Sequence, residues 1–180
     1  NKDIIRDLGD AEWILQMKVK RYRESRILTL SQKRYVEKIL RSFNMVNCKQ
    51  TETPANQEKL VQAQINENQT IAAEKPYRNL VGSLLYAAIT TRLDIAYAVN
   101  VVSRFMNDPN ESHWIAGKRI LRYLNGTKQI GLIFKGKNNT VNSELEIQGY
   151  SDADWGGDHS DRRSTTGYIV MINGNVVSWV

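Results

Sequence analysis

The sequence predicts an α+β fold in which strands near the two ends of the chain enclose a helical middle. Three observations favour this fold class. Apolar and basic residues alternate over Trp13–Lys20, which is typical of a half-buried strand. Apolar residues recur at helical spacing over Tyr35–Phe43 and Tyr77–Leu85, and helices are also indicated over Ile95–Met106 and Glu111–Leu124. Asn173-Gly174 then separates two short apolar runs, which is a strong β-hairpin signal.

The first elements are two strands and a helix. After the strand over Trp13–Lys20, the polar run 23–26 predicts a turn, and Ile27–Leu30 predicts a returning strand. Ser31 then occupies the position expected of a helix N-cap. Apolar and aromatic residues follow at helical spacing: Tyr35, Val36, Ile39, Leu40 and Phe43.

The middle of the chain is a polar stretch followed by helices. Residues 48–75 are rich in Gln, Asn, Thr and Glu and contain Pro54, so we expect a loop or tether there. Pro76 suits the first turn of a helix. Further helices are expected over Ile95–Met106 and over Glu111–Leu124, the latter closed by Gly126 as its C′ residue.

From Ile130 onward the apolar period changes to two. A polar boundary near 135–144 separates the helical part from an antiparallel sheet. The expected strands cover Ile130–Phe134, Leu145–Asp152, Tyr168–Ile172 and Val176–Trp179.

Charge is unevenly distributed along the 180 residues, whose formal net charge is +6. Residues 1–50 hold 12 Lys/Arg against 6 Asp/Glu, and residues 101–143 hold 7 against 2. Residues 144–180 reverse the balance, with 2 against 6. The two basic blocks favour a polyanionic partner, and the acidic tail favours a bound cation. Cys48 is the only cysteine, which excludes an internal disulfide and favours a reducing compartment.

Several segments carry a family resemblance. The segments are, in order, Arg6–Gly9 with Trp13–Met17; Tyr77–Tyr86, Asp94–Val99, His113-Trp114 and Lys118–Thr127; and Gly149–Asp158 with Arg162–Tyr168 and Ser178-Trp179. Together they resemble the Pol polyprotein of copia-type LTR retrotransposons over nearly the whole chain. Two positions depart from the family pattern, because Gln16 replaces the Gly of "FLG" and Leu93 replaces the Pro of "RPDI".

The resemblance implies a division of the chain into parts of that polyprotein. These parts are the end of the reverse transcriptase palm, with its hairpin and a thumb-like helix, over 1–47; a polar linker over 48–75; a helical thumb and connection over 76–134; and the first antiparallel strands of an incomplete ribonuclease H-like domain over 145–180. The polymerase's Tyr-x-Asp-Asp turn would precede residue 1, and further ribonuclease H carboxylates would follow residue 180. We therefore expect a fragment of an enzyme that copies RNA into DNA and cleaves the RNA of hybrids. The fragment itself is expected to be inactive, which leaves its own status as an enzyme open.

The acidic run Tyr150–Asp158 contains the expected metal ligands. By resemblance, Asp152 is a catalytic residue and a Mg²⁺ ligand of the parent ribonuclease H. Strand alternation places Asp154 on the same face as a second candidate ligand, although a turn beside Gly156-Gly157 explains it equally well. Two-metal hydrolysis requires more carboxylates than one strand supplies, so we do not expect this fragment to bind Mg²⁺ stably.

Basic residues carry the expectation of nucleic-acid binding. Those on the two basic helices suit contacts with a phosphate backbone, and a solvated helix face is the alternative for each. By resemblance, Trp13 and Met17 belong to a primer-gripping hairpin, although ordinary strand core would look the same. We expect His113 to pack or to cap a helix rather than to act as a base. The predicted nucleic-acid-binding residues are Lys33, Arg34, Lys38, Arg41, Lys118, Arg119 and Arg122.

The expected partners are an RNA–DNA hybrid or primer–template duplex and the rest of the Pol polyprotein. We expect no membrane contact, because the most apolar stretch is shorter than the roughly 20 residues of a membrane span, and no small-molecule substrate. The resemblance implies a cytoplasmic location in a virus-like particle, with a nuclear phase as an option. Two alternatives stay open: a non-catalytic nucleic-acid-binding module and a decayed remnant of an element.

Overall fold

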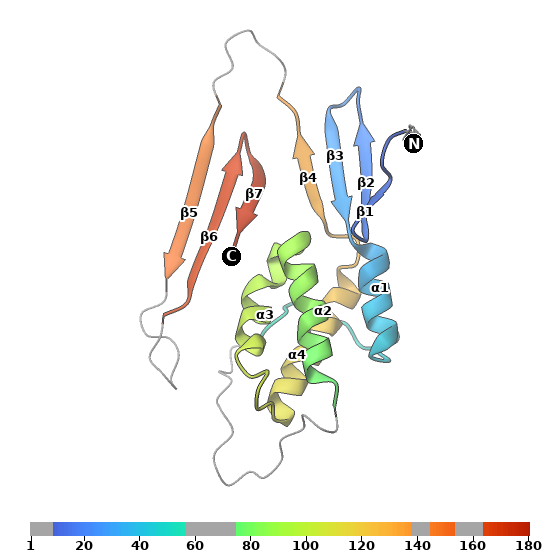
Figure 1. Cartoon of the computed structure of the whole chain (residues 1–180), viewed down its shortest axis with the longest axis vertical. Helices are drawn as coiled ribbons and strands as arrows, with labels where there is room; N and C mark the ends of the chain where they lie inside the picture. The colour runs from blue at the N-terminus through green and yellow to red at the C-terminus, as the bar shows by residue number, and fades with distance from the viewer. Residues whose placement is uncertain (1–8, 57–74, 138–144, 154–163) are drawn as a thin grey trace, which may run out of the picture.

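A computed structural model describes residues 9–56, 75–137, 145–153 and 164–180 of the chain. Within these ranges, four α-helices are combined with one four-stranded and one three-stranded antiparallel sheet. The predicted α+β class is therefore confirmed. Figure 1 shows the four-stranded sheet above the helices and the three-stranded sheet beside it.

The four-stranded sheet begins with a hairpin that the sequence did not reveal. The single strand predicted over Trp13–Lys20 is wrong, because Leu15 and Gln16 have φ angles of 46° and 65° and turn the chain. Positive φ at both central residues is typical of the two-residue hairpin turn whose twist best matches that of the flanking strands. The predicted turn at 23–26 and the returning strand are confirmed. In order, the strands are β1 (Trp13–Ile14), β2 (Met17–Tyr22), β3 (Ile27–Ser31) and β4 (Leu132–Lys135).

Strand β4 reaches β3 from about a hundred residues away along the chain. It pairs antiparallel with β3, and Leu132 lies opposite Leu30. The residue before it, Gly131, lies so close to β3 that a Cβ atom there would be 2.2 Å from the carbonyl oxygen of Leu30. Only glycine fits this approach without displacing the backbone.

The predicted helices are present, with different ends. The N-cap of the first is Gln32 rather than Ser31, although the Ser31 hydroxyl still accepts a hydrogen bond from the Lys33 N–H at 3.3 Å. Gly126 is the last residue of the fourth helix rather than C′, and its φ lies outside the left-handed region. The helices are α1 (Lys33–Ser42), α2 (Tyr77–Thr90), α3 (Ala96–Ser103) and α4 (Glu111–Gly126), with a 3₁₀ helix over Leu93–Ile95 before α3.

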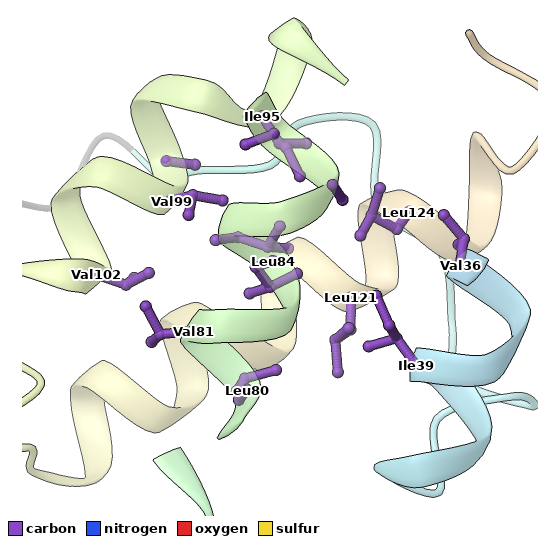
Figure 2. Packing of buried hydrophobic residues seen from close by; sticks show 14 of the residues in the cluster. Val36, Ile39, Leu80, Val81, Leu84, Ile95, Val99, Val102, Leu121 and Leu124 are labelled. Carbon is purple, nitrogen blue, oxygen red and sulfur yellow. The ribbon is translucent and has the colours of Figure 1, made fainter. Parts of the chain in front are cut away.

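The hydrophobic core lies between the four helices, as Figure 2 shows. Each helix contributes a stripe of side chains that are at most 4% exposed. Burying a Leu, Ile or Val side chain contributes about 1.5–3 kcal/mol, so this core is the main source of stability for the scaffold. Its members include Val36 and Ile39 of α1, Leu80, Val81 and Leu84 of α2, Val99 and Val102 of α3, and Leu121 and Leu124 of α4.

His113 caps α4, as expected. Its Nδ1 accepts a hydrogen bond from the Asn110 N–H at 3.0 Å, and its own N–H donates to Asn110 Oδ1 at 3.1 Å. The buried imidazole also stacks on Phe105, with ring centroids 3.9 Å apart. Such a reciprocal pair satisfies two backbone donors at the helix start, so His113 has a structural role.

The three-stranded sheet is an antiparallel meander near the C-terminal end of the chain. Asn173 and Gly174 form its second turn, with φ angles of 49° and 75°, which confirms the predicted hairpin. The strands are β5 (Ile147–Ala153), β6 (Thr166–Ile172) and β7 (Asn175–Trp179), and they lie in that order.

Two side chains of β7 attach this sheet to the rest of the molecule. The Asn175 amide binds the backbone of Lys135 twice: its Oδ1 accepts from the Lys135 N–H at 2.7 Å, and its Nδ2 donates to the Lys135 carbonyl at 3.1 Å. The Trp179 indole N–H donates to the Ala88 carbonyl in α2 at 2.9 Å. The second sheet is therefore bound to an edge strand of the first and to the last turn of α2.

Candidate nucleic-acid interface

A basic groove lies between the first sheet and α1. Because side chains alternate across a strand, β2 presents Lys18, Lys20 and Tyr22 on one face. Ser31 and Thr29 of β3 lie opposite the two lysines on the same face. This surface forms part of a groove of about 750 Å³. Further lining residues are Trp13 of β1, Lys33, Arg34 and Glu37 of α1, and the segment 129–133.

Trp13 holds two of the groove's cations. The Arg34 Cζ lies 4.4 Å from the centroid of the indole ring, and the Lys18 Nζ lies 5.8 Å from it. Trp13 is 37% exposed and lines the groove. Its ring is therefore open to the groove while it contacts both cations. A cation–π contact at a partly exposed site contributes about 0.5–1 kcal/mol. The indole thus acts as a platform that positions Arg34 and Lys18.

The described lining of the groove is strongly positive. Lys18, Lys20, Lys33 and Arg34 contribute four cations, and Glu37 contributes one carboxylate. The Lys33 Nζ lies 4.0 Å from Glu37 Oε1, and such a surface pair binds weakly. A polyanion bound here would release the counterions condensed on its own phosphates, so its affinity would rise with the number of phosphates that these cations neutralise.

A buried ion-pair network fixes the wall of the groove. Arg92 is fully buried, and its guanidinium donates to both carboxylate oxygens of Asp94 at 2.9 and 2.6 Å. It also donates to the Thr127 carbonyl at 3.0 Å and to Thr127 Oγ1 at 2.7 Å. The Thr127 carbonyl in turn accepts from the Ile130 N–H at 3.0 Å. Arg92 therefore holds the turn from which the lining segment 129–133 begins.

The network keeps Asp94 ionised. Burial by itself raises the pKa of this carboxyl group, but the hydrogen bonds and charge of Arg92 and a hydrogen bond from the Tyr123 hydroxyl outweigh it, so the pKa lies below its usual value. Burial and the neighbouring Asp94 raise the pKa of Tyr123. Both shifts follow from the observed pairing and burial. The segment in which Leu93 replaces the family's proline therefore has a structural role.

The predicted cations of α4 lie elsewhere. Arg122 donates from Nε to the Lys49 carbonyl at 2.7 Å, and Arg119 donates from Nη2 to Thr53 Oγ1 at 2.9 Å. Together with Lys118 they are half-buried and line no part of the groove. The arginines hold the described part of the polar linker, 48–56, against the helix. Their predicted contact with phosphates stays a prediction.

The remaining predicted binding residues lie outside the groove lining. Lys38 and Arg41 are exposed on α1 and lie outside the groove lining, although helical spacing continues the stripe of Arg34 through both. Met17 is half-buried and is not part of the lining. Sequence reasoning missed Lys18 and Lys20, for which the apolar and basic alternation of β2 was the available signal.

The acidic run contributes one described carboxylate. Asp152 is exposed in β5, and its Oδ1 accepts a hydrogen bond from the Ala153 N–H at 2.9 Å. Asp154 lies outside the described residues. Among the residues that are described, no three His, Cys, Asp or Glu side chains gather as a metal site would require. Mg²⁺ takes several oxygen ligands, and Asp152 is the one carboxylate of the acidic run that lies among the described residues. The predicted metal ligation therefore stays a prediction.

The described helices include none that is both long and apolar enough to cross a membrane.

The chain matches several known proteins along nearly its whole length. It is 44% identical over 180 residues to the retrovirus-related Pol polyprotein from transposon TNT 1-94 of Nicotiana tabacum, covering 97% of this chain and 13% of that protein. It is 42% identical over 175 residues to the Pol polyprotein from transposon RE1 of Arabidopsis thaliana, covering 97% and 11%.

A shorter relative is matched over most of its own length. The chain is 36% identical over 180 residues to the uncharacterized mitochondrial protein AtMg00810 of Arabidopsis thaliana, covering 97% of this chain and 68% of that protein. No protein-family profile matches the chain, and no solved structure does. The chain spans about an eighth of the Pol polyproteins named above, and on these matches it belongs to the Pol polyprotein family of copia-type retrotransposons.

Proposed function

We propose that the chain is the part of a reverse transcriptase–ribonuclease H polyprotein that holds a primer–template duplex or RNA–DNA hybrid by its phosphates. The observation that carries this proposal is the convergence of Lys18, Lys20, Lys33 and Arg34 in one groove. These cations come from two strand positions and one helix end. The Trp13 platform orders two of them before any ligand binds, which lowers the entropic cost of binding.

Binding through this groove would be insensitive to base sequence. Lysine and arginine contacts with phosphates position a nucleic acid without reading its bases. Affinity would then fall steeply with salt, because each neutralised phosphate releases condensed counterions. The basic stripe of α1, which runs from Arg34 through Lys38 to Arg41, would extend the contact along the duplex.

We propose that RNA-directed DNA synthesis and hybrid cleavage belong to the parent polyprotein and that this chain performs neither alone. Asp152 would be one Mg²⁺ ligand of the parent ribonuclease H, with Asp154 as the second candidate. The described part of the chain does not gather the ligands that two-metal hydrolysis needs. Hybrid cleavage by the isolated chain that is abolished by Asp152→Asn would contradict this proposal.

The alternative of a non-catalytic binding module also has a specific observation behind it. The chain covers 68% of AtMg00810 but 13% of the TNT 1-94 polyprotein. A short protein made largely of this region would retain the groove without the rest of Pol. Salt-dependent binding by the isolated chain is expected whether the chain is a part of Pol or a separate binding module. If the chain is a decayed remnant, no such binding is expected. For the parent, the proposed location remains a cytoplasmic virus-like particle.

The test compares two variants that each lose two positive charges. Lys20→Gln/Lys33→Gln removes charges from the groove, and Lys49→Gln/Arg78→Gln removes two exposed charges outside it. Fluorescence anisotropy with a labelled RNA–DNA hybrid, measured over a salt series, gives the slope of log affinity against log salt. We expect the groove variant to flatten this slope by about 2, since each phosphate contact contributes about 0.9.

The control variant is expected to leave the slope nearly unchanged. Equal losses in the two variants would show that bulk charge rather than the groove binds the hybrid, and the proposal would then be wrong. Urea unfolding of both variants checks that the side-chain changes have not altered the fold. Lys20, Lys33 and Lys49 are exposed, so their substitution is expected to change stability by no more than about 0.5 kcal/mol. Arg78 is also exposed, but its Nε donates to the Met106 carbonyl at 3.1 Å, so the control variant is expected to lose about 0.5–1 kcal/mol.

A further inference from the structure

A second basic pocket lies at the far end of the β2–β3 hairpin. Its volume is about 580 Å³. Its lining combines three cations that are available for a ligand, Arg21, Arg26 and Lys135, with the apolar side chains of Ile27, Leu28 and Phe134.

The pocket adjoins the groove at Tyr22. This residue lines both cavities and is 50% exposed. In the sheet register, Tyr22 lies opposite Ile27, and Ile27 lies opposite Lys135. Residues directly opposite one another share a face of the sheet, and Tyr22 shares the face of Lys20. Lys135 therefore lies on the groove's own face, where the groove ends.

The charges of this pocket are available, with one exception. Arg23 also lines the pocket, but its Nη2 binds both carboxylate oxygens of Asp10 at 2.8 and 3.0 Å. The described lining includes no Asp or Glu. Arg26 is held in place because its Nη1 donates to the Lys137 carbonyl at 2.8 Å. Such a bond leaves other guanidinium donors of Arg26 for a ligand.

The spacing suits a nucleic-acid strand that runs along β2. Lys18 and Tyr22 are four residues apart, about 13 Å at the rise of a β-strand. This length corresponds to about four steps along the axis of a duplex, at about 3.4 Å per step. A strand bound along the groove would therefore reach the second pocket within its next few nucleotides.

We infer that the groove and the second pocket form one continuous phosphate track, in which Arg21, Arg26 and Lys135 bind the phosphates that follow those held by Lys18 and Lys20. This inference rests on the proposed function of the groove. It adds a site at the hairpin end and sets a minimum length of nucleic acid for full affinity. The second pocket takes lining residues from both faces of β2, because Arg21 belongs to the opposite face from Tyr22.

The experiment uses a long RNA–DNA hybrid that reaches both cavities and a short hybrid, closed by a hairpin loop, that fills the groove alone. The variant is Arg21→Gln/Lys135→Gln, whose side chains are on exposed residues. Its matched control is Lys49→Gln/Arg78→Gln. For the long hybrid, we expect the variant to flatten the salt slope by about 2. For the short hybrid, we expect wild type and variant to have the same affinity and slope.

Each other outcome has a separate meaning. If wild type binds both hybrids but the variant matches the control on the long one, the track is wrong and the groove stands. If the variant weakens both hybrids equally, the pocket does not act as an extension and the track is again wrong. If wild type binds neither hybrid, the proposed function fails, and the track fails with it. If the double variant does not fold, Lys135→Gln alone replaces it in the same measurement, with an expected slope change of about 1.

Discussion

The arginines around α4 and the cations of the groove look alike in the sequence, but the structure uses them differently. Arg92, Arg119 and Arg122 donate to groups within the molecule: a carboxylate, a hydroxyl and backbone carbonyls. The groove cations Lys18 and Arg34 instead contact the face of an aromatic ring. A ring orders a cation without using its hydrogen-bond donors, so these donors remain available to a phosphate.

The partner of a cation, rather than its helix, therefore decides the role of that cation. Both α1 and α4 have basic residues at helical spacing, and each pattern is compatible with phosphate binding. The partners of the α4 arginines lie 66 and 73 residues away along the chain. A helix pattern alone contains no information on such a distant partner.

Removing the partner of the most buried cation should have the greatest effect on stability. Asp94→Ala leaves the Arg92 guanidinium, whose side chain is 1% exposed, without its carboxylate. An uncompensated buried charge is strongly destabilising, so we expect the free energy of unfolding in urea to fall by about 3 kcal/mol. Glu52→Ala, which truncates an exposed carboxylate, is the control and should change it by less than about 0.5 kcal/mol. A loss below about 1 kcal/mol in Asp94→Ala would show that Arg92 finds another partner.

The same pair gives a pH dependence with a definite sign. The folded-state pKa of Asp94 lies below its usual value, so its contribution to stability is present above the unfolded pKa of about 3.9 and is lost as the pH falls through the folded pKa. Acid unfolding should therefore depend less on pH in Asp94→Asn than in wild type below about pH 4. Parallel acid profiles for the two proteins would contradict the pKa shift.

A smaller effect is expected where the arginine is half-buried. Arg122→Ala removes the bond to the Lys49 carbonyl. We expect the free energy of unfolding to fall by about 1 kcal/mol, because this is a charged hydrogen bond whose contribution is reduced by partial exposure to solvent. Arg34→Ala should cost less than Arg122→Ala in stability and more in hybrid affinity. If anisotropy shows that Arg122→Ala weakens binding as much as Arg34→Ala, the division between the two regions is wrong.

A modest gain in stability is expected from a substitution in the turn beside the groove. Gln16 has a φ of 65° in the turn that brings Trp13 to Lys18. Glycine adopts this conformation without strain, so Gln16→Gly should raise the free energy of unfolding by about 0.5–1 kcal/mol. Gln50→Gly, at an exposed position without positive φ, is the control and should not stabilise the protein. A destabilised Gln16→Gly would show that the side chain of Gln16 contributes a contact that outweighs the strain.

Local patterns were sufficient for much of the fold. The stripes of α1, α2 and α4 and the Asn173-Gly174 turn were readable because each signal lies within one element. The β1–β2 turn was missed because Leu15 and Gln16 are not turn-forming residues, and only the backbone reveals their positive φ. The end of α4 was misplaced because Thr127, rather than Gly126, caps it.

The candidate site was less predictable than the fold. Arg34 and Lys33 were identified on their helix, but the groove also needs Lys18 and Lys20 from β2 and a wall after α4. Pairing of β4 with β3 joins segments about a hundred residues apart, and nothing in either strand specifies the other. Such long-range pairing depends on the whole chain topology, so the groove emerges only in three dimensions.

The Asn175 amide also has a consequence for where this protein can be shortened. By binding both the N–H and the carbonyl of Lys135, it imitates one residue of a neighbouring strand and occupies the outer edge of β4. A version that stopped at residue 137 would keep all four helices and the four-stranded sheet, yet this edge would lose its cover. Uncovered edges pair with strands of other molecules. The three-stranded sheet, through Asn175, is therefore expected to prevent self-association at this edge of β4.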